Sequence, residues 1–216
     1  MDQIQHDASK DWEKLLDPDT LKTNLVRASV YLASYELLKA AIVQNPRGFI
    51  NMVNSDPSSD GQEYRKNVVS LCPKDRLHAS CLWFQKMGAI DDADIAMIKE
   101  IRSHRNDIAH ELPKYIGDSK YAVNIQLLDS IHFMIGKIER WWIREIEMEV
   151  NADYDHVDKS AVPDDQIHSG RMIMMDWIHK VICGQEDDLQ RLLIFHKSLQ
   201  RKNQGGDSNK PPERTR

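Results

Sequence analysis

Long hydrophobic runs and paired cysteines are both missing from this sequence. No apolar segment approaches the ~18 residues that a membrane-spanning helix needs, because the run from Ala28 to Tyr35 is broken by Glu36. The N-terminal residues carry charges of both signs and no apolar segment of the signal-peptide kind. The three cysteines form no CxxC motif, which predicts buried or free thiols in a reducing compartment. We therefore expect a cytoplasmic protein without a membrane segment.

The usual catalytic signatures are also absent. The sequence holds no GxxxxGKS/T, GxGxxG, GxSxG or HExxH segment, so the enzyme classes that depend on them are not expected. None of the nine histidines pairs with another His or Cys at a zinc-ligand spacing on one helix face. His78 lies between Cys72 and Cys81, which leaves a metal site open against the more common pattern of buried thiols beside a surface histidine. We expect no metal and no cofactor.

The charge of the chain is slightly acidic and unevenly distributed. With 34 acidic and 29 basic residues, the net charge is −5, which argues against coating nucleic acid by bulk electrostatics. Residues 145–165 hold eight acids and one lysine, whereas residues 197–216 hold six bases and two acids. A bound polyanion would avoid the first segment and use the second. A solvated acidic loop and a disordered tail are the more common explanation of such segments.

Helix signals dominate the rest of the chain. Asp17 followed by Pro18 is typical of a helix start, and apolar residues then recur at helical spacing up to about Asn45, where Pro46 and Gly48 should end the helix. A loop with at most one short helical turn is expected over 46–70. Further helices are predicted at residues 74–87, 91–112, 119–150, 170–183 and 187–200.

No pair of alternating runs flanks a hairpin turn, so no strand is predicted. The expected fold is all-α: an antiparallel four-helix-bundle core with one or two additional C-terminal helices. The expected domains are a single helical domain over residues 11–200 and a disordered tail over 201–216.

One position breaks the apolar pattern of the third helix. Read in steps of three and four residues, its apolar seam consists of Ile98, Ile101, Arg105, Ile108 and Leu112. Arg105 therefore occupies what should be a core position, where an unpaired guanidinium is costly. It must pair with an acid such as Glu36, line a cavity, or face a partner subunit. The seam alone favours a structural pair and a functional site about equally.

A histidine follows this arginine at the end of the same helix. His110 lies five residues after Arg105, about 140° around a helix with ~100° per residue, so the two do not stack on one face. Arg102, Asn106 and His110 share a stripe at a spacing of four. Arg105 and His110 are therefore expected to line adjacent walls of a groove, or the helix bends near its end.

The RxxxxH spacing alone is a weak signal, since Arg191 and His196 repeat it with only apolar residues between them. Its surroundings are more specific: KEIRSHRNDIAHE, residues 99–111, follows the helix-breaking GAIDD. This segment closely resembles the RX4–6H motif of HEPN-domain proteins, and SYELLKAAIVQNP upstream resembles their first bundle helix. The resemblance covers about residues 18–150.

The resemblance implies a metal-independent endoribonuclease that acts on RNA as a homodimer. Such proteins are toxins or antiviral-defence effectors, so a cognate antitoxin or regulatory protein is a further expected partner. Arg105 and His110 would form the catalytic pair. Asn106 and Glu111 would support the site, and Arg102 and His104 would contact RNA. The alternative for Arg102 and His104 is that they are simple surface residues.

One position departs from the family pattern. HEPN toxins controlled by a nucleotidyltransferase usually carry a tyrosine two residues after the histidine, where this sequence has Leu112; the next tyrosine is Tyr115. Control by nucleotide transfer to that tyrosine is therefore not expected. Two other interpretations stay open: a non-catalytic HEPN module that binds a partner protein or nucleotide, and a helical bundle with an accidental motif. The presence of both Arg105 and His110 favours the enzyme, and the acidic balance favours the binding module.

Overall fold

The computed structural model describes residues 10–55, 58, 60–182 and 193. The chain divides into two compact units, residues 1–176 and 177–216. Over the described ranges every regular element is a helix and none is a strand, which confirms the all-α prediction. None of the helices in these ranges is long and apolar enough to cross a membrane. The tail over 201–216, and the helix predicted at 187–200 apart from one residue, lie outside the described residues.

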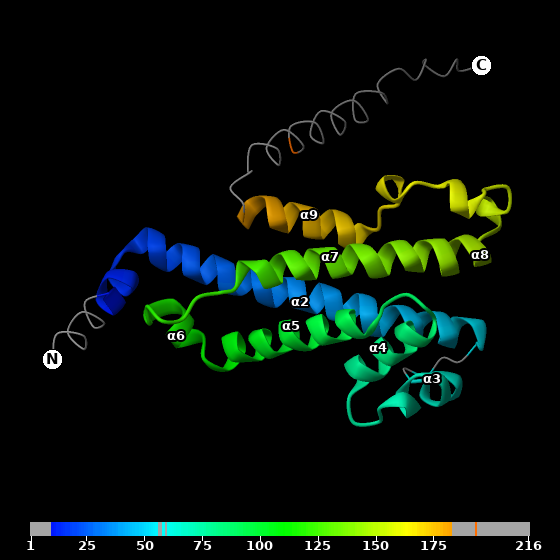
Figure 1. The fold of residues 1–216 in the computed structure, drawn as a ribbon, viewed down its shortest axis with the longest axis horizontal. Coiled ribbons are helices and arrows are strands. Elements are labelled where there is room, and N and C mark those ends of the chain that lie inside the picture. The colour runs from blue at the N-terminus through cyan, green and yellow to red at the C-terminus, as the bar shows by residue number, and fades with distance from the viewer. Residues whose placement is uncertain (1–9, 56–57, 59, 183–192, 194–216) are drawn as a thin grey trace, which may run out of the picture. The chain divides into compact units, whose positions relative to one another are not determined.

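α2 (Pro18–Val53) is the helix against which the others of the first unit pack. α4 (Arg76–Lys86), α5 (Asp92–His110) and α7 (Ile125–Trp142) all contact it, and Figure 1 shows α5 and α7 lying along its length. Burying a large apolar side chain contributes about 1.5–3 kcal/mol. The side chains that are fully buried here include Tyr31, Leu38, Ile42, Ile101, Ile108, Ile131, Ile135 and Ile138.

Two contacts fix the relative direction of α2 and α7. The Asn45 side-chain amide donates to Glu139 at 3.1 Å. One turn further along each helix, Phe49 packs edge-to-face on Trp142 with ring centroids 5.8 Å apart. The two helices therefore run in the same direction, whereas α5 runs opposite to both (Figure 1). The sequence predicted antiparallel packing. In the structure α5 packs antiparallel to α2 and α7, whereas α2 and α7 are parallel to each other.

The first long helix does not end before Pro46, as its sequence predicts, but continues to Val53. Pro46 lies inside the helix and is buried. A proline in that position removes one backbone donor and usually breaks a helix, at a cost of about 3 kcal/mol or more. Tertiary contacts on both sides explain the continuation, because Ile42 is buried before it and Phe49 packs on Trp142 after it.

Side-chain caps set the starts of α4 and α5 close to the predicted positions. Asp75 accepts the backbone N–H of His78 at the start of α4. Asp91 and Asp94 form a reciprocal capping box at the start of α5. Between the two helices Gly88 has φ +80°, the left-handed conformation that glycine adopts most easily. These local signals are the reason that both helices could be predicted.

The fourth predicted helix starts later than Ser119, the expected first residue, because α7 begins at Ile125. Two side chains explain the later start. Asn124 accepts the backbone N–H of Leu127 at 3.3 Å and so caps α7. The backbone N–H of Ser119 instead donates to Asp11 at 2.7 Å, which holds the preceding link in a non-helical path.

Shorter elements connect and follow these helices, and the last of them, α9, extends past the end of the first unit. The expected loop over 46–70 contains the end of α2, a short helix and a 3-10 turn, and the end of α7 continues through a π-helical turn to Val150, as predicted. Three 3-10 turns then lead to α9, which agrees with the helix predicted at 170–183. The bounds of these helices and turns are α3 Gln62–Asn67, Val69–Leu71, α6 Leu112–Gly117, Ile143–Glu147, α8 Met148–Val150, Ala152–Tyr154, Lys159–Ala161, Asp164–Gln166 and α9 Gly170–Ile182.

An aromatic cluster joins α2, α4 and α7. Trp142 is 6% exposed and contacts Phe49, Phe84 and Trp141, with ring centroids 5.8, 6.2 and 6.5 Å apart. Trp83 packs on Phe84 at 5.2 Å. Aromatic pairs of this kind contribute about 0.5–1.5 kcal/mol beyond their buried area, so the cluster is a main attachment between these helices.

Candidate functional site

The Arg105 side chain lies between α5 and α2. Its Nη2 donates to Glu36 Oε1 at 3.1 Å and its Nη1 to Asn106 Oδ1 at 3.3 Å, and the guanidinium lies over the Tyr35 ring, 5.3 Å from the centroid. The pair with Glu36, one of the alternatives that the sequence left open, is therefore present. Both side chains are partly exposed, at 32% and 48%, so the pair contributes about 0–1 kcal/mol. Stability alone does not account for an arginine at this position.

Arg105 also lines a groove of about 330 Å³. The groove lies where the start of α4 meets α2 and α5. It holds five cationic side chains and one carboxylate, so its lining is strongly positive. The lining residues are Tyr35, Lys39, Lys74, Asp75, Arg76, Leu77, Arg102, Arg105 and Asn106.

The one carboxylate of the groove is tied to Arg102. Asp75 accepts a hydrogen bond from the Arg102 guanidinium and another from the His78 backbone N–H, the latter at 3.1 Å. Burial alone would raise the pKa of Asp75, but these two hydrogen bonds outweigh it, and the pKa lies below its usual value. Asp75 is therefore ionised at neutral pH, and the Arg102–Asp75 pair is a fixed part of the groove wall.

His110 and Glu111 lie at the end of α5 and do not line this groove. His110 is exposed, and within the part of the chain that the structure describes its imidazole has no hydrogen bond or ion pair. Glu111 closes the helix through its backbone N–H, which donates to Asp107, and its carboxylate pairs with Lys114 at 2.8 Å. The structure thus brings Arg102, Arg105 and Asn106 of the predicted site together and leaves His110 outside, on the exposed helix end.

His104 has an internal role. It is half-buried, and its Nε2 accepts the backbone N–H of Asn124 at 2.9 Å, which joins the end of α5 to the start of α7. The imidazole packs edge-to-face on Tyr31 and Tyr115, with ring centroids 4.9 and 5.7 Å apart. Burial lowers the pKa of His104, so the neutral ring that accepts this bond is favoured. An RNA contact through its Nε2 would require breaking the link. Tyr115 is itself buried.

No group of three or more His, Cys, Asp or Glu side chains in the described ranges could hold a metal ion. The cysteines seen there, Cys72 and Cys81, are free thiols. Burial raises the pKa of Cys81 to about 12, so this thiol is protonated and unreactive at neutral pH. His78 and these two thiols are therefore not arranged as a metal site.

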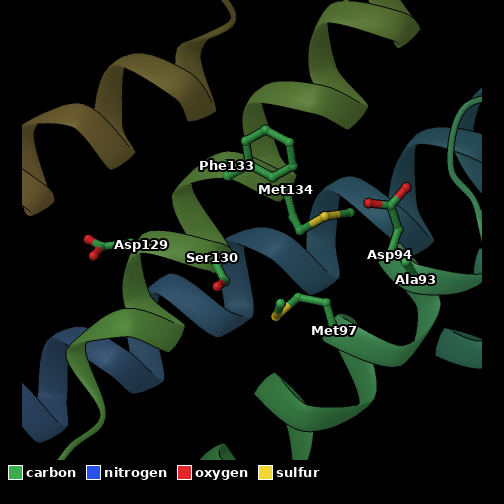
Figure 2. A pocket seen from close by; sticks show the side chains of 7 residues that line it. All are labelled: Ala93, Asp94, Met97, Asp129, Ser130, Phe133 and Met134. Carbon is green, nitrogen blue, oxygen red and sulfur yellow. The ribbon is translucent and has the colours of Figure 1, made fainter.

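A second hollow, of about 360 Å³, lies between α5 and α7. Figure 2 shows Met97 and Met134 facing each other across it, beside the ring of Phe133. Its lining contains no cation and no histidine. Asp94 at its edge serves in the capping box and pairs with Lys137. This hollow lacks the groups that phosphate chemistry needs, so the groove around Arg105 is the stronger candidate.

Sequence reasoning missed three cations of the groove, Lys39, Lys74 and Arg76. One weak signal was present, because Lys74 and Arg76 flank the Asp75 cap. Nothing in the sequence connects Lys74 and Arg76 to Arg105, about thirty positions away, and only the packing of α4 on α2 and α5 does so. No protein-family model, curated protein or solved structure matches this chain. The geometry of these side chains is therefore the basis for a functional conclusion.

Proposed function

We propose that this protein is a metal-independent endoribonuclease, an effector of the toxin or antiviral-defence kind, with Arg105 and His110 as its catalytic pair. One observation carries the proposal: the helix whose arginine lines a positive groove ends in an exposed histidine that has no partner among the described residues. Two of the five N–H groups of a guanidinium are engaged in Arg105, by Glu36 and Asn106. Donors therefore remain for a ligand.

These residue types suit cleavage of RNA through its own 2′-hydroxyl. A base removes the 2′-hydroxyl proton, the 2′-oxygen attacks phosphorus, and the 5′-oxygen leaves with a proton from an acid. The products are a 2′,3′-cyclic phosphate and a 5′-hydroxyl. His110 can serve as base or acid because a neutral imidazole accepts a proton on one nitrogen and an imidazolium donates one. Arg105 stays charged and can hold two phosphate oxygens while negative charge builds up on them.

The neighbouring residues have supporting roles in this proposal. Asn106 accepts from Arg105 and so orients the guanidinium. Glu111 stabilises the end of α5 beside His110 through its pair with Lys114. Arg102 adds positive charge to the groove, although its pair with Asp75 limits its movement.

A second copy of the chain completes the site. One imidazole cannot act on both sides of an in-line displacement, and the exposed end of α5 is free to meet its symmetry mate across a two-fold axis. We therefore expect static light scattering at micromolar concentration to give twice the chain mass of 25.0 kDa. A His110→Cys variant should form interchain cross-links with a short bis-maleimide. A monomeric mass, or no more cross-linking than in an otherwise identical Lys22→Cys variant, would contradict the composite site.

Cleavage of RNA by the purified protein is expected to persist in excess EDTA and to leave 2′,3′-cyclic phosphate ends. The reason is that His110 and Arg105 supply both proton transfer and charge stabilisation. The ends can be identified by mass spectrometry of a short oligoribonucleotide substrate. Strict dependence of the rate on a divalent ion would exclude this mechanism.

A non-catalytic module that binds a nucleotide is the second candidate function. The observation that favours it is the position of His110 outside the groove, which by itself has the polarity of a phosphate-binding site. Incubation with RNA distinguishes the two functions. A binding module leaves RNA intact at any protein concentration. A ribonuclease cleaves RNA and loses this activity when His110 is replaced by alanine.

A further inference from the structure

The groove around Arg105 concentrates positive charge in a chain that is acidic as a whole. The full sequence has a net charge of −5, yet the groove contains five cations, of which Lys39, Lys74 and Arg76 are exposed. Glu36, Asp60 and Asp75 pair with four of these cations. Five cations facing three carboxylates leave an excess of positive charge in the groove. Such a local excess attracts anions at a specific place.

Several hydrogen-bond donors of the groove are unused. Lys74 and the Tyr35 hydroxyl have no hydrogen-bond partner among the described residues, and Arg105 uses only part of its donor set. The Nε of Arg105 also has no partner there, but it is buried and so is not available to a ligand. Donors held close together without acceptors match the several acceptor oxygens of a phosphate group. The groove thus offers both the charge and the donors that a phosphate needs.

The start of α4 adds to this polarity. Arg76 and Leu77 are the first residues of this helix of 11 residues, and both line the groove. The N-terminus of a helix carries partial positive charge and favours anions. Asp75 already accepts one backbone N–H of the first turn, that of His78. The partial positive charge of the helix N-terminus therefore only adds to the charge of the side-chain cations.

We propose that this groove binds phosphate groups of a nucleotide chain, with Lys39, Lys74 and Arg76 as contacts additional to Arg105. The identity of the chain as RNA rests on the proposed ribonuclease function. Phosphate binding itself does not, because it requires no proton transfer and no His110. The groove would hold a strand that extends from the scissile phosphate, with the exposed lysines on its outer side.

The test measures binding of a fluorescent 2′-O-methyl oligoribonucleotide, which cannot be cleaved because its 2′-oxygens are blocked. The groove variant is Lys39→Ala with Lys74→Ala. The matched control is Lys22→Ala with Lys86→Ala, which removes the same charge from exposed positions outside the groove. ATP, added as a competitor, distinguishes a mononucleotide from a strand.

The groove variant should raise the Kd about tenfold at low salt, while the control variant stays within about twofold of wild type. The slope of log K against log salt should become less steep by about 1.4, because each phosphate of a single strand that a lysine neutralises adds ~0.7 to the slope. Displacement by equimolar ATP would support the groove and identify a mononucleotide as its ligand. Equal weakening in both variants, or no binding of either probe by wild type, would overturn the proposal.

The same measurements separate this proposal from the ribonuclease function. Groove-dependent binding without any cleavage of unmodified RNA would contradict the ribonuclease function and support phosphate binding in the groove. Cleavage that depends on His110, with equal binding in both double variants, would support the ribonuclease function and contradict phosphate binding in the groove. Melting temperatures of all variants should match that of wild type, since the substituted lysines are exposed.

Discussion

Alanine in place of His110 or Arg105 is expected to lower the rate of RNA cleavage ~100-fold or more, the usual loss when a proton-transfer group or a donor to developing negative charge is removed. His110 is exposed and Arg105 is only partly buried, so neither change should unfold the protein. The Arg105–Glu36 pair is partly solvated and contributes about 0–1 kcal/mol. Initial rates on a labelled oligoribonucleotide should be compared with melting temperatures of the same preparations.

A matched control exists within the chain. Arg191 and His196 have the same spacing as the catalytic pair and lie outside the described residues. We expect Arg191→Ala and His196→Ala to leave cleavage intact, because only apolar residues separate them. Arg105→Lys should retain part of the activity, since it keeps the charge but loses the two-pronged contact. If His110→Ala remains fully active while Arg105→Ala melts far below wild type, Arg105 is structural and the ribonuclease function is wrong.

Trp142→Ala should have the largest effect on stability, a loss of about 3–5 kcal/mol as for other buried aromatic residues. Its ring contacts α2 through Phe49 and α4 through Phe84, so the change leaves a cavity between three helices. Typical domains have about 5–15 kcal/mol of total stability, and the melting temperature should therefore fall by about 10 °C or more. Calorimetry or circular dichroism of the melting transition measures the change.

The control for this prediction lies on the same helix. Phe133 is 60% exposed, so Phe133→Ala removes an aromatic ring of α7 without opening a cavity. Its effect on the free energy of unfolding should stay within about 0.5 kcal/mol. A similar fall in both variants would mean that the aromatic cluster does not join the helices as described.

Local signals explain which parts of the fold could be predicted. The reciprocal cap of Asp91 and Asp94, and Gly88 before it, are encoded within a few residues, so the start of α5 was predictable. The passage of α2 through Pro46 was not, because its cause is the packing of Phe49 on Trp142, almost a hundred residues away. Tertiary contacts overrode a local preference there.

The same distinction applies to the candidate site. The sequence offered Glu36 as one possible partner of Arg105, because each is a charged residue on an otherwise apolar helix face, and it left a functional site open as the alternative. The sequence did not predict that His104 is half-buried. The His104 imidazole accepts a hydrogen bond from Asn124, and the position of Asn124 depends on the path of the link between α6 and α7. The lysines of the groove could not be predicted either, because lysines occur throughout the sequence and only the folded structure brings Lys39 and Lys74 to the groove.

Glu36 gives the groove a property that its cations alone would not have. It binds Arg105 and Lys39 at 3.1 and 3.0 Å, so an arriving anion exchanges with a resident carboxylate. A singly charged anion such as chloride gains little from that exchange, whereas a phosphate or a strand with several phosphates gains contacts that one carboxylate cannot supply. If the groove binds phosphate as proposed, Glu36 acts as an intramolecular competitor, and the groove should then prefer multiply charged ligands over the small ions of the surrounding solution.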